Sequence, residues 1–175
     1  APAPHPRRPL SSLPLQTRGL APPPKSPGGT DHPCGLGARL ASQIVEECHQ
    51  LMTFHKPALT ALVVFGGTNV KADVRELTQR TPTLLVATPG RLNDLLYNYG
   101  ADQLCQSLST LVFDEADQLL EMGFRPDITK ILDKLRPTAP YRQTLLFSAT
   151  MPSDVMAVAK FAMRPDARMV DTVGE

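Results

Sequence analysis

From residue 38 onward the sequence predicts an α/β fold built on a doubly wound, mainly parallel sheet. Short runs that are apolar throughout alternate with amphipathic stretches, the runs being LTALVVF, TLLVAT, LSTLVF and RQTLLFSA. Strands without polar alternation are typical of parallel sheets buried on both faces. Their alternation with helical stretches predicts crossover connections between parallel neighbours.

The first half of this region shows the pattern element by element. One apolar stripe predicts a helix from residue 38 to about residue 52, formed by Leu40, Ile44, Val45, Cys48, Leu51 and Met52. Strands are predicted at 59–65, which runs into a diglycine, and at 83–88, which Pro89 stops. Helices are predicted at 70–80 and at 90–99, the second closed by Gly100.

The second half continues in the same way. Strands are predicted at 108–113 and 142–149, and helices at 115–122, 126–135 and 152–163. The last helix has Pro152 near its start, a position that proline favours. A further short strand is predicted at 167–172.

Residues 1–37 have a different composition. Ten of the 18 prolines lie in residues 1–33, and no helical or strand period survives there, so we predict a disordered segment followed by one domain at 38–175. Its basic start, with Arg7 and Arg8 well before the first acid at Asp31, is typical of a mitochondrial transit peptide. The proline density argues against the amphipathic helix that such a peptide needs.

Composition excludes several classes of function. A net charge of +1 gives no broad attraction to nucleic acid, so a nucleic-acid site must be local. The three cysteines, at unrelated spacings, predict no disulfides, and no apolar run is long enough to span a bilayer. His32, Cys34, Cys48 and His49 could form a zinc set, but adjacent Cys48 and His49 point to different helix faces, which disfavours zinc.

Polar or glycine-rich residues follow four of the predicted strands. These are Gly66–Gly67–Thr68–Asn69, Thr88–Pro89–Gly90–Arg91, Asp114–Glu115–Ala116–Asp117 and Ser148–Ala149–Thr150. Parallel strands end at one edge of a sheet, and ligands bind at that edge. The sequence therefore predicts a single polar rim.

The cluster of three acidic residues on this rim allows two interpretations. Asp114 can reach the water shell of a Mg²⁺ that bridges phosphates, and Glu115 can orient a water for attack on a terminal phosphate. Alternatively, Glu115 and Asp117 favour the start of the next helix through its dipole. Ser148 and Thr150 either hydrogen-bond Asp117 or cap the following helix.

The other two segments are equally open. Thr88–Arg91 offers backbone N–H groups at a helix start and an arginine beside them, which suits a phosphate backbone. It can also be a proline at a helix start with a solvated arginine. Gly66 and Gly67 either allow close approach of a nucleic-acid backbone or form a tight turn.

Taken together, these stretches resemble the DEAD-box family of ATP-dependent RNA helicases. VFDEAD is similar to the family's naming motif, and ATPGRL and SAT match the preceding and following motifs in order and spacing. ASQI is similar to the tail of another motif, and the diglycine fits the family pattern. The likeness covers residues 40–175 and implies the first of two RecA-like domains, a fold of the P-loop NTPase class.

The resemblance also implies roles and ligands. It makes Asp114 the carboxylate associated with Mg²⁺ through water, and Glu115 the residue that activates water. It makes Asp117, Ser148 and Thr150 the contacts that couple ATP hydrolysis to RNA strand separation. The RNA-backbone side consists of Gly66, Gly67, Thr88, Pro89, Gly90 and Arg91. ATP and Mg²⁺ are the implied cofactors, and single-stranded RNA, gripped through phosphates and 2′-hydroxyls, is the implied partner.

Two departures from the family pattern qualify this expectation. No phosphate loop ending in Gly-Lys-Thr occurs in residues 1–40, and Leu36–Ala41 stands where the family has Pro-Thr-Arg-Glu-Leu-Ala. We therefore expect the chain alone to lack ATPase activity, and we expect a longer parent to carry a second RecA-like domain. Residues 1–39 fit a shifted reading frame or a mis-spliced exon joined to helicase sequence.

Three functional readings follow from the sequence. The chain is the ATPase part of an RNA helicase, a non-catalytic RNA- or protein-binding module derived from one, or an unstable fragment. We expect an intracellular location. GGTNVKADVRELTQR is similar to a subset of the family that includes mitochondrial helicases, while the nucleus and cytoplasm stay open.

Overall fold

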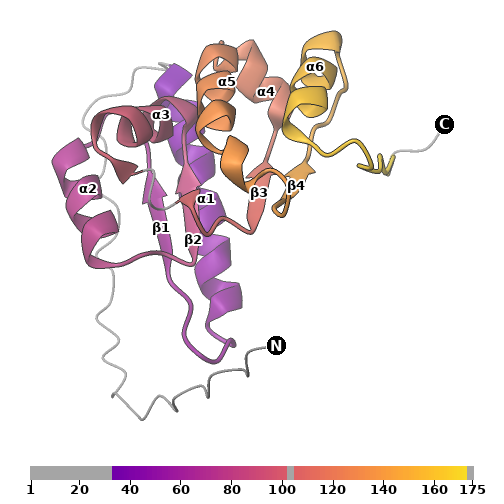
Figure 1. The fold of residues 1–175 in the computed structure, drawn as a ribbon. Helices are drawn as coiled ribbons and strands as arrows, with labels where there is room; N and C mark the ends of the chain where they lie inside the picture. The colour runs from indigo at the N-terminus through magenta and orange to yellow at the C-terminus, as the bar shows by residue number, and fades with distance from the viewer. Residues whose placement is uncertain (1–32, 102–104, 173–175) are drawn as a thin grey trace, which may run out of the picture. The chain divides into compact units, whose positions relative to one another are not determined.

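A computed structural model describes residues 33–101 and 105–172, with side chains from residue 37 onward (Figure 1). The segment predicted to be disordered lies outside the described residues up to residue 32. Helix α1 (Pro33–Met52) begins inside that predicted segment rather than near residue 38. Pro33 suits the first position of a helix, because the missing N–H would have no partner there.

The predicted order of helices and strands is confirmed through α6. After α1 come β1 (Ala61–Val64), α2 (Val70–Gln79), β2 (Leu84–Ala87), α3 (Pro89–Asn98), β3 (Thr110–Phe113), α4 (Ala116–Glu121), α5 (Arg125–Lys134), the 3-10 helix η2 (Arg136–Thr138), β4 (Gln143–Leu146) and α6 (Ser153–Ala162).

The strand predicted at residues 167–172 does not form. Met169 and Val170 are 71% and 80% exposed, and no described strand lies beside them to supply backbone partners. An apolar, β-branched stretch becomes a strand only when a neighbouring strand pairs with it. The sequence pattern was therefore insufficient at this position.

The strands are parallel, as predicted, but they form two separate pairs. β1 pairs with β2 from Ala61↔Leu84 to Val64↔Ala87, and β3 pairs with β4 from Thr110↔Gln143 to Phe113↔Leu146. Among the described residues no strand joins β2 to β3. The predicted α/β fold with parallel strands is therefore confirmed, and in this chain its sheet is incomplete.

The β1–β2 pair is covered on both faces. Val64 packs with Leu77 of α2 and Leu95 of α3 in one apolar cluster. On the other face α1 packs against both strands, with Ala41 and Val45 buried. In Figure 1, α1 runs alongside β1 and β2. This half has the layered arrangement that a parallel sheet requires.

Among the residues that the structure describes, helices cover only one face of the β3–β4 pair. Phe113 packs with Ile128, Val155 and other side chains of α4, α5 and α6 in the largest apolar cluster of the described residues. Side chains alternate between the two faces of a strand, so the neighbours of Phe113 and Leu146 lie on the face away from these helices. Two of these neighbours, Val112 and Phe147, are 49% and 56% exposed. This bare sheet face is unusual for a parallel pair.

Helix–helix contacts hold the two halves together. Leu96 of α3 packs with Ile131 and Leu135 at α5. The Asn93 side-chain amide donates a hydrogen bond to Asp127 Oδ1 at 2.8 Å, which links the same two helices. The strand ends of both halves are thereby positioned by α3 and α5.

Candidate functional site

A buried aspartate ties the end of β3 to the end of β4. Thr150 donates to Asp117 Oδ2 twice, from its hydroxyl at 2.8 Å and from its N–H at 3.1 Å. Ser148 Oγ accepts the Asp117 N–H at 3.1 Å and donates to Thr150 O at 2.7 Å. Of the two interpretations from the sequence, the structure therefore shows hydrogen bonds to Asp117.

The alternative interpretation of Thr150, a cap on the next helix, is not what the hydrogen bonds show. α6 begins after Pro152, and no side chain caps it. The Thr150 hydrogen bond, above all, holds the pKa of Asp117 below its usual value, and the Ser148 hydroxyl and backbone N–H groups add to this effect. Asp117 is therefore a carboxylate at neutral pH, and the network depends on that charge.

Asp114 and Glu115 lie beside this network on the exposed side of the strand end. Asp114 Oδ1 accepts the N–H of Glu115 at 3.1 Å, and both side chains are exposed to solvent. Glu115 has φ +48° and ψ 53°, the one left-handed non-glycine residue among those described. Such strain in a non-glycine residue is found mainly at functional sites.

The donor set at this edge fits a Mg²⁺ held through water. Carboxylate oxygens are its preferred protein ligands, and the ion usually keeps several waters. No cluster of three or more His, Cys, Asp or Glu that could hold a metal directly occurs in the described part of the chain. At this edge the described residues offer one exposed aspartate, Asp114, and its exposed neighbour, Glu115.

The diglycine follows β1 and makes a turn with an open outer surface. Gly67 has φ +88°, which a residue with a side chain rarely adopts. Gly66 has no such constraint, and a Cβ added at either glycine would meet no atom within 4 Å. Packing therefore does not explain Gly66, and the turn leaves room for another molecule's backbone to approach.

Thr88, Pro89 and Gly90 form the start of α3 beside this turn. The Thr88 side chain does not cap the helix, and its hydroxyl instead accepts the Gly66 N–H at 3.4 Å. The N–H groups of Gly90 and Arg91 therefore have no side-chain cap. Uncapped N–H groups at a helix start favour a phosphate or another anion.

Arg91 lies inside the protein. Both interpretations from the sequence, a phosphate contact and a solvated side chain, need an exposed guanidinium, but this residue is only 8% exposed. Its Nη1 pairs with Asp73 of α2, and its Nη2 donates to Thr68 O at 2.7 Å. No local sequence pattern indicated this pairing, because Asp73 lies on a different helix.

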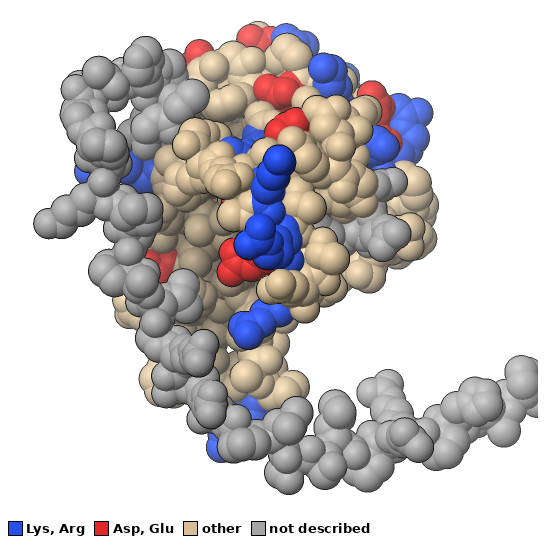
Figure 2. Space-filling model, turned by 90° about the vertical axis from the view of Figure 1, so that its left-hand side faces the viewer, with Lys and Arg blue, Asp and Glu red and all other residues tan. Residues whose placement is uncertain are grey.

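The face of the molecule around α2 has no broad basic field. Figure 2 shows Lys and Arg side chains interspersed with Asp and Glu over this face. α2 itself alternates exposed Lys71 and Arg75 with acidic residues. Any nucleic-acid contact must therefore rely on the local geometry of the turn and the helix start, as the net charge predicts.

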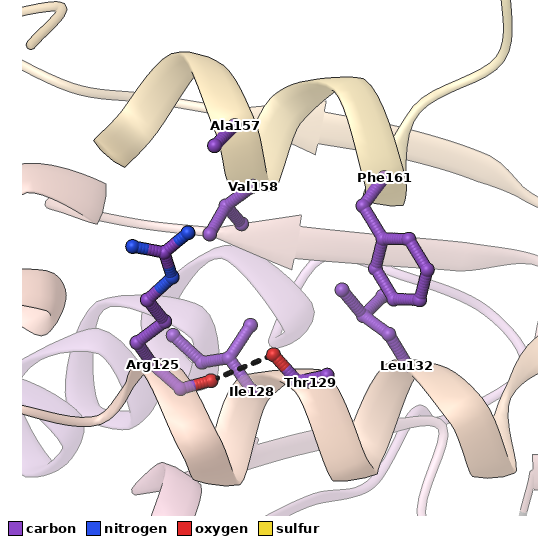
Figure 3. A pocket seen from close by; sticks show the side chains of 7 residues that line it. All are labelled: Arg125, Ile128, Thr129, Leu132, Ala157, Val158 and Phe161. Atoms are coloured by element: carbon purple, nitrogen blue, oxygen red, sulfur yellow. Dashed lines mark hydrogen bonds between the residues drawn. The ribbon is translucent and has the colours of Figure 1, made fainter. Parts of the chain in front are cut away.

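The structure has a pocket and a groove that the sequence did not predict. One, of about 150 Å³, lies between α5 and α6 and is lined by Arg125, Ile128, Thr129, Leu132, Ala157, Val158 and Phe161 (Figure 3). It contains none of the predicted site residues. The groove, of about 610 Å³, starts at Gly90 and follows α3 past Asn93 and Tyr97 to Lys130. Only the second adjoins the candidate RNA-backbone residues.

Comparison with known proteins decides the family. Residues 38–158 match the family described as DEAD/DEAH box helicase. The chain belongs to this family. The DEAD motif at residues 114–117 and the SAT motif at residues 148–150 are thus the two segments that Asp117 joins by hydrogen bonds.

Curated relatives are similar over most of this chain. It is 42% identical over 137 residues to DEAD-box ATP-dependent RNA helicase 26 of Oryza sativa subsp. japonica, covering 78% of this chain and 25% of the relative. It is 37% identical over 134 residues to the mitochondrial ATP-dependent RNA helicase MSS116 of Phaeosphaeria nodorum, covering 77% of this chain and 24% of that protein. This DEAD-box chain thus spans about a quarter of the length of these relatives.

Solved structures confirm the RecA-like fold of the helicase family. A DEAD box protein from Methanococcus jannaschii aligns with a TM-score of 0.64 at 32% identity, covering 73% of this chain and 33% of that chain. Mss116p bound to ssRNA and AMP-PNP aligns with a TM-score of 0.59 at 36% identity, covering 71% of this chain and 25% of that chain. The described residues form an incomplete RecA-like domain.

Proposed function

We propose that this chain is part of an ATP-dependent RNA helicase, in which its strand ends couple ATP hydrolysis to RNA binding and local duplex unwinding. The observation that carries the proposal is the Asp117 network, because it connects the exposed Asp114–Glu115 edge to the end of β4. A change in charge at the carboxylates can therefore move the Ser148–Thr150 segment.

On the hydrolytic side, Asp114 would hold Mg²⁺ through water and Glu115 would orient the attacking water. When bound, Mg·ATP supplies the phosphoryl group and the charge that these carboxylates face. Glu115 has a left-handed backbone, and its side chain is exposed to solvent. The lowered pKa of Asp117 keeps its carboxyl group ionised at neutral pH, so this group accepts hydrogen bonds from Thr150.

On the RNA side, Gly66, Gly67, Thr88, Pro89 and Gly90 would contact the sugar–phosphate backbone. The open surface over the diglycine and the uncapped N–H groups of α3 support this role. Neither feature reads bases, so binding should be independent of sequence. Arg91 belongs to this side through its position and not through an exposed charge.

The test for RNA binding uses the 175-residue chain and two unrelated single-stranded RNA oligonucleotides. Fluorescence anisotropy should give similar dissociation constants for both, and affinity should fall as salt rises. A chain that binds neither RNA, or that strongly prefers one sequence, would refute the backbone-contact proposal. A chain that binds neither RNA would be a protein-binding module or an unstable fragment, and lack of a cooperative melt would identify the fragment.

The chain alone should not bind Mg·ATP tightly. The backbone N–H groups and lysine of a phosphate loop supply most of the phosphate contacts in this class of site, and no Gly-Lys-Thr or Gly-Lys-Ser sequence occurs in the 175 residues. Calorimetric titration should show no saturable binding at micromolar concentration. Tight binding would show that another segment holds the phosphates.

We also propose that the parent protein carries a second RecA-like domain and acts inside the cell. No helix of the described residues is long and apolar enough to cross a membrane. The name of one relative includes the word mitochondrial. Imaging of the tagged parent distinguishes mitochondrion, nucleus and cytoplasm.

A further inference from the structure

We propose that Asp73 is a positioning residue for RNA binding, which acts by holding the Arg91 guanidinium against the underside of the diglycine turn. The inference rests on the proposed RNA-backbone role of that turn. Nothing in the family motifs of this sequence pointed to Asp73, which lies in the first turn of the helix predicted at 70–80.

Two hydrogen bonds tie the turn after β1 to the start of α3. The Thr88 hydroxyl accepts the Gly66 N–H at 3.4 Å, and Arg91 Nη2 donates to Thr68 O at 2.7 Å. The ion pair between Arg91 and Asp73 of α2 fixes the guanidinium that makes the second of these bonds. Since Arg91 is planar and forked, it can serve both partners at once in one orientation.

The ion pair is buried, with side-chain exposures of 7% for Arg91 and 14% for Asp73. Burial raises the pKa of the Asp73 carboxyl, and the charge and hydrogen bond of Arg91 oppose this without cancelling it. A buried pair of this kind adds little to stability compared with apolar residues of the same volume. What the pair supplies here is a fixed position for the guanidinium and, through it, for Thr68.

Thr88 and Arg91 bind the turn at the Gly66 N–H and at Thr68 O, while a Cβ added at Gly66 or Gly67 would meet no atom within 4 Å. A loop that contacts a phosphate backbone through its own N–H groups gains affinity when it is held in the bound shape before binding. Asp73 would provide that pre-organisation without touching RNA.

The salt dependence of RNA binding separates positioning from direct phosphate contact. Loss of one phosphate contact lowers the slope of log K against log salt by about 0.7 for single strands. Asp73→Asn should weaken binding of a single-stranded RNA by about fivefold or more, a typical coupling between residues in one network, with an unchanged slope. Arg91→Lys should do the same, because lysine keeps the charge but cannot serve Asp73 and Thr68 together.

Asp133→Asn is the matched control. Asp133 also pairs with an arginine, Arg136, but on the exposed surface of α5, away from the diglycine turn. This variant should bind RNA as the unchanged chain does. All variants are melted first, and if Asp73→Asn does not melt cooperatively, Arg91→Lys decides the question alone.

The possible results each decide the matter. If the unchanged chain binds RNA and both variants bind equally well, the positioning role is refuted while the proposed function stands. If Arg91→Lys binds normally and Arg91→Ala loses about 0.7 in slope, Arg91 contacts phosphate directly and the inference fails. If the unchanged chain does not bind RNA, the proposed function fails and this inference fails with it.

Discussion

Replacing Arg142 by methionine should destabilise the β4 half of the molecule. Arg142 is 3% exposed, and its Nη1 donates to Leu135 O at 2.7 Å and to the Thr138 hydroxyl at 3.3 Å. Its Nη2 donates to Ala162 O at 3.4 Å, and its Nε donates to the Thr144 hydroxyl at 3.2 Å. No carboxylate among the described residues pairs with it, so carbonyl and hydroxyl oxygens alone satisfy a buried charge.

The magnitude follows from these contacts. A hydrogen bond from a charged group contributes about 1.5–3 kcal/mol, and only the bond to Leu135 is short enough for that range. The longer hydrogen bonds contribute less. Burial disfavours the charged form of Arg142, so removing this charge offsets part of the stability lost with the hydrogen bonds. Arg142→Met should therefore lower the free energy of unfolding by about 2 kcal/mol and Tm by about 6–10 °C.

Urea and thermal unfolding followed by circular dichroism measure this change. Arg136→Met is the matched control, because Arg136 is an exposed arginine nearby whose ion pair with Asp133 should contribute under about 0.5 kcal/mol. Equal effects of the two substitutions would refute the reasoning. Arg142 would then not be the residue that joins β4 to the ends of α5 and α6.

Further predictions concern the turn, the Asp117 network and the bare sheet face. Gly67→Ala should lower stability by about 1–2 kcal/mol because its φ is +88°, whereas Gly66→Ala should leave the melt unchanged or raise it slightly. The pKa of Asp117 is lower in the folded state than in the unfolded state. The stability that its carboxylate contributes is therefore present above about pH 3.9 and is lost as pH falls through the folded pKa. In urea unfolding, acid should therefore destabilise Asp117→Asn less than the unchanged chain. Equal acid sensitivity would contradict this. Val112→Thr should lower the fluorescence of an apolar dye without lowering Tm, because Val112 is exposed beside Phe147 on the uncovered face of β3–β4.

Local sequence patterns predicted most of the fold. Apolar runs and amphipathic stretches give β1 to β4 and α1 to α6, since each depends on residues close in the chain. The pairing of strands depends on residues far apart in the chain. The separation of β2 from β3 therefore does not follow from the apolar run of either strand alone. The stretch at residues 167–172 failed for the same reason, because it has strand composition but no described neighbour.

The candidate site divides in the same way. The motif residues were predicted, and the hydrogen bonds from Thr150 to Asp117 form across a sequence separation of 33 residues. The left-handed backbone of Glu115 and the burial of Arg91 were not predicted. Both depend on packing around the strand ends, and no short pattern around Arg91 reveals a partner on α2.

The relative affinity of the 175-residue chain for RNA and DNA tests the central claim most directly. In this measurement, unlabelled single-stranded RNA or single-stranded DNA of the same sequence competes with a labelled RNA for the chain. Fluorescence anisotropy at one salt concentration monitors the displacement. The backbone role proposed for the diglycine turn and the start of α3 predicts that RNA competes more strongly, because a 2′-hydroxyl can donate and accept hydrogen bonds where DNA has none. Equal competition by DNA, or none by either strand, would contradict the account.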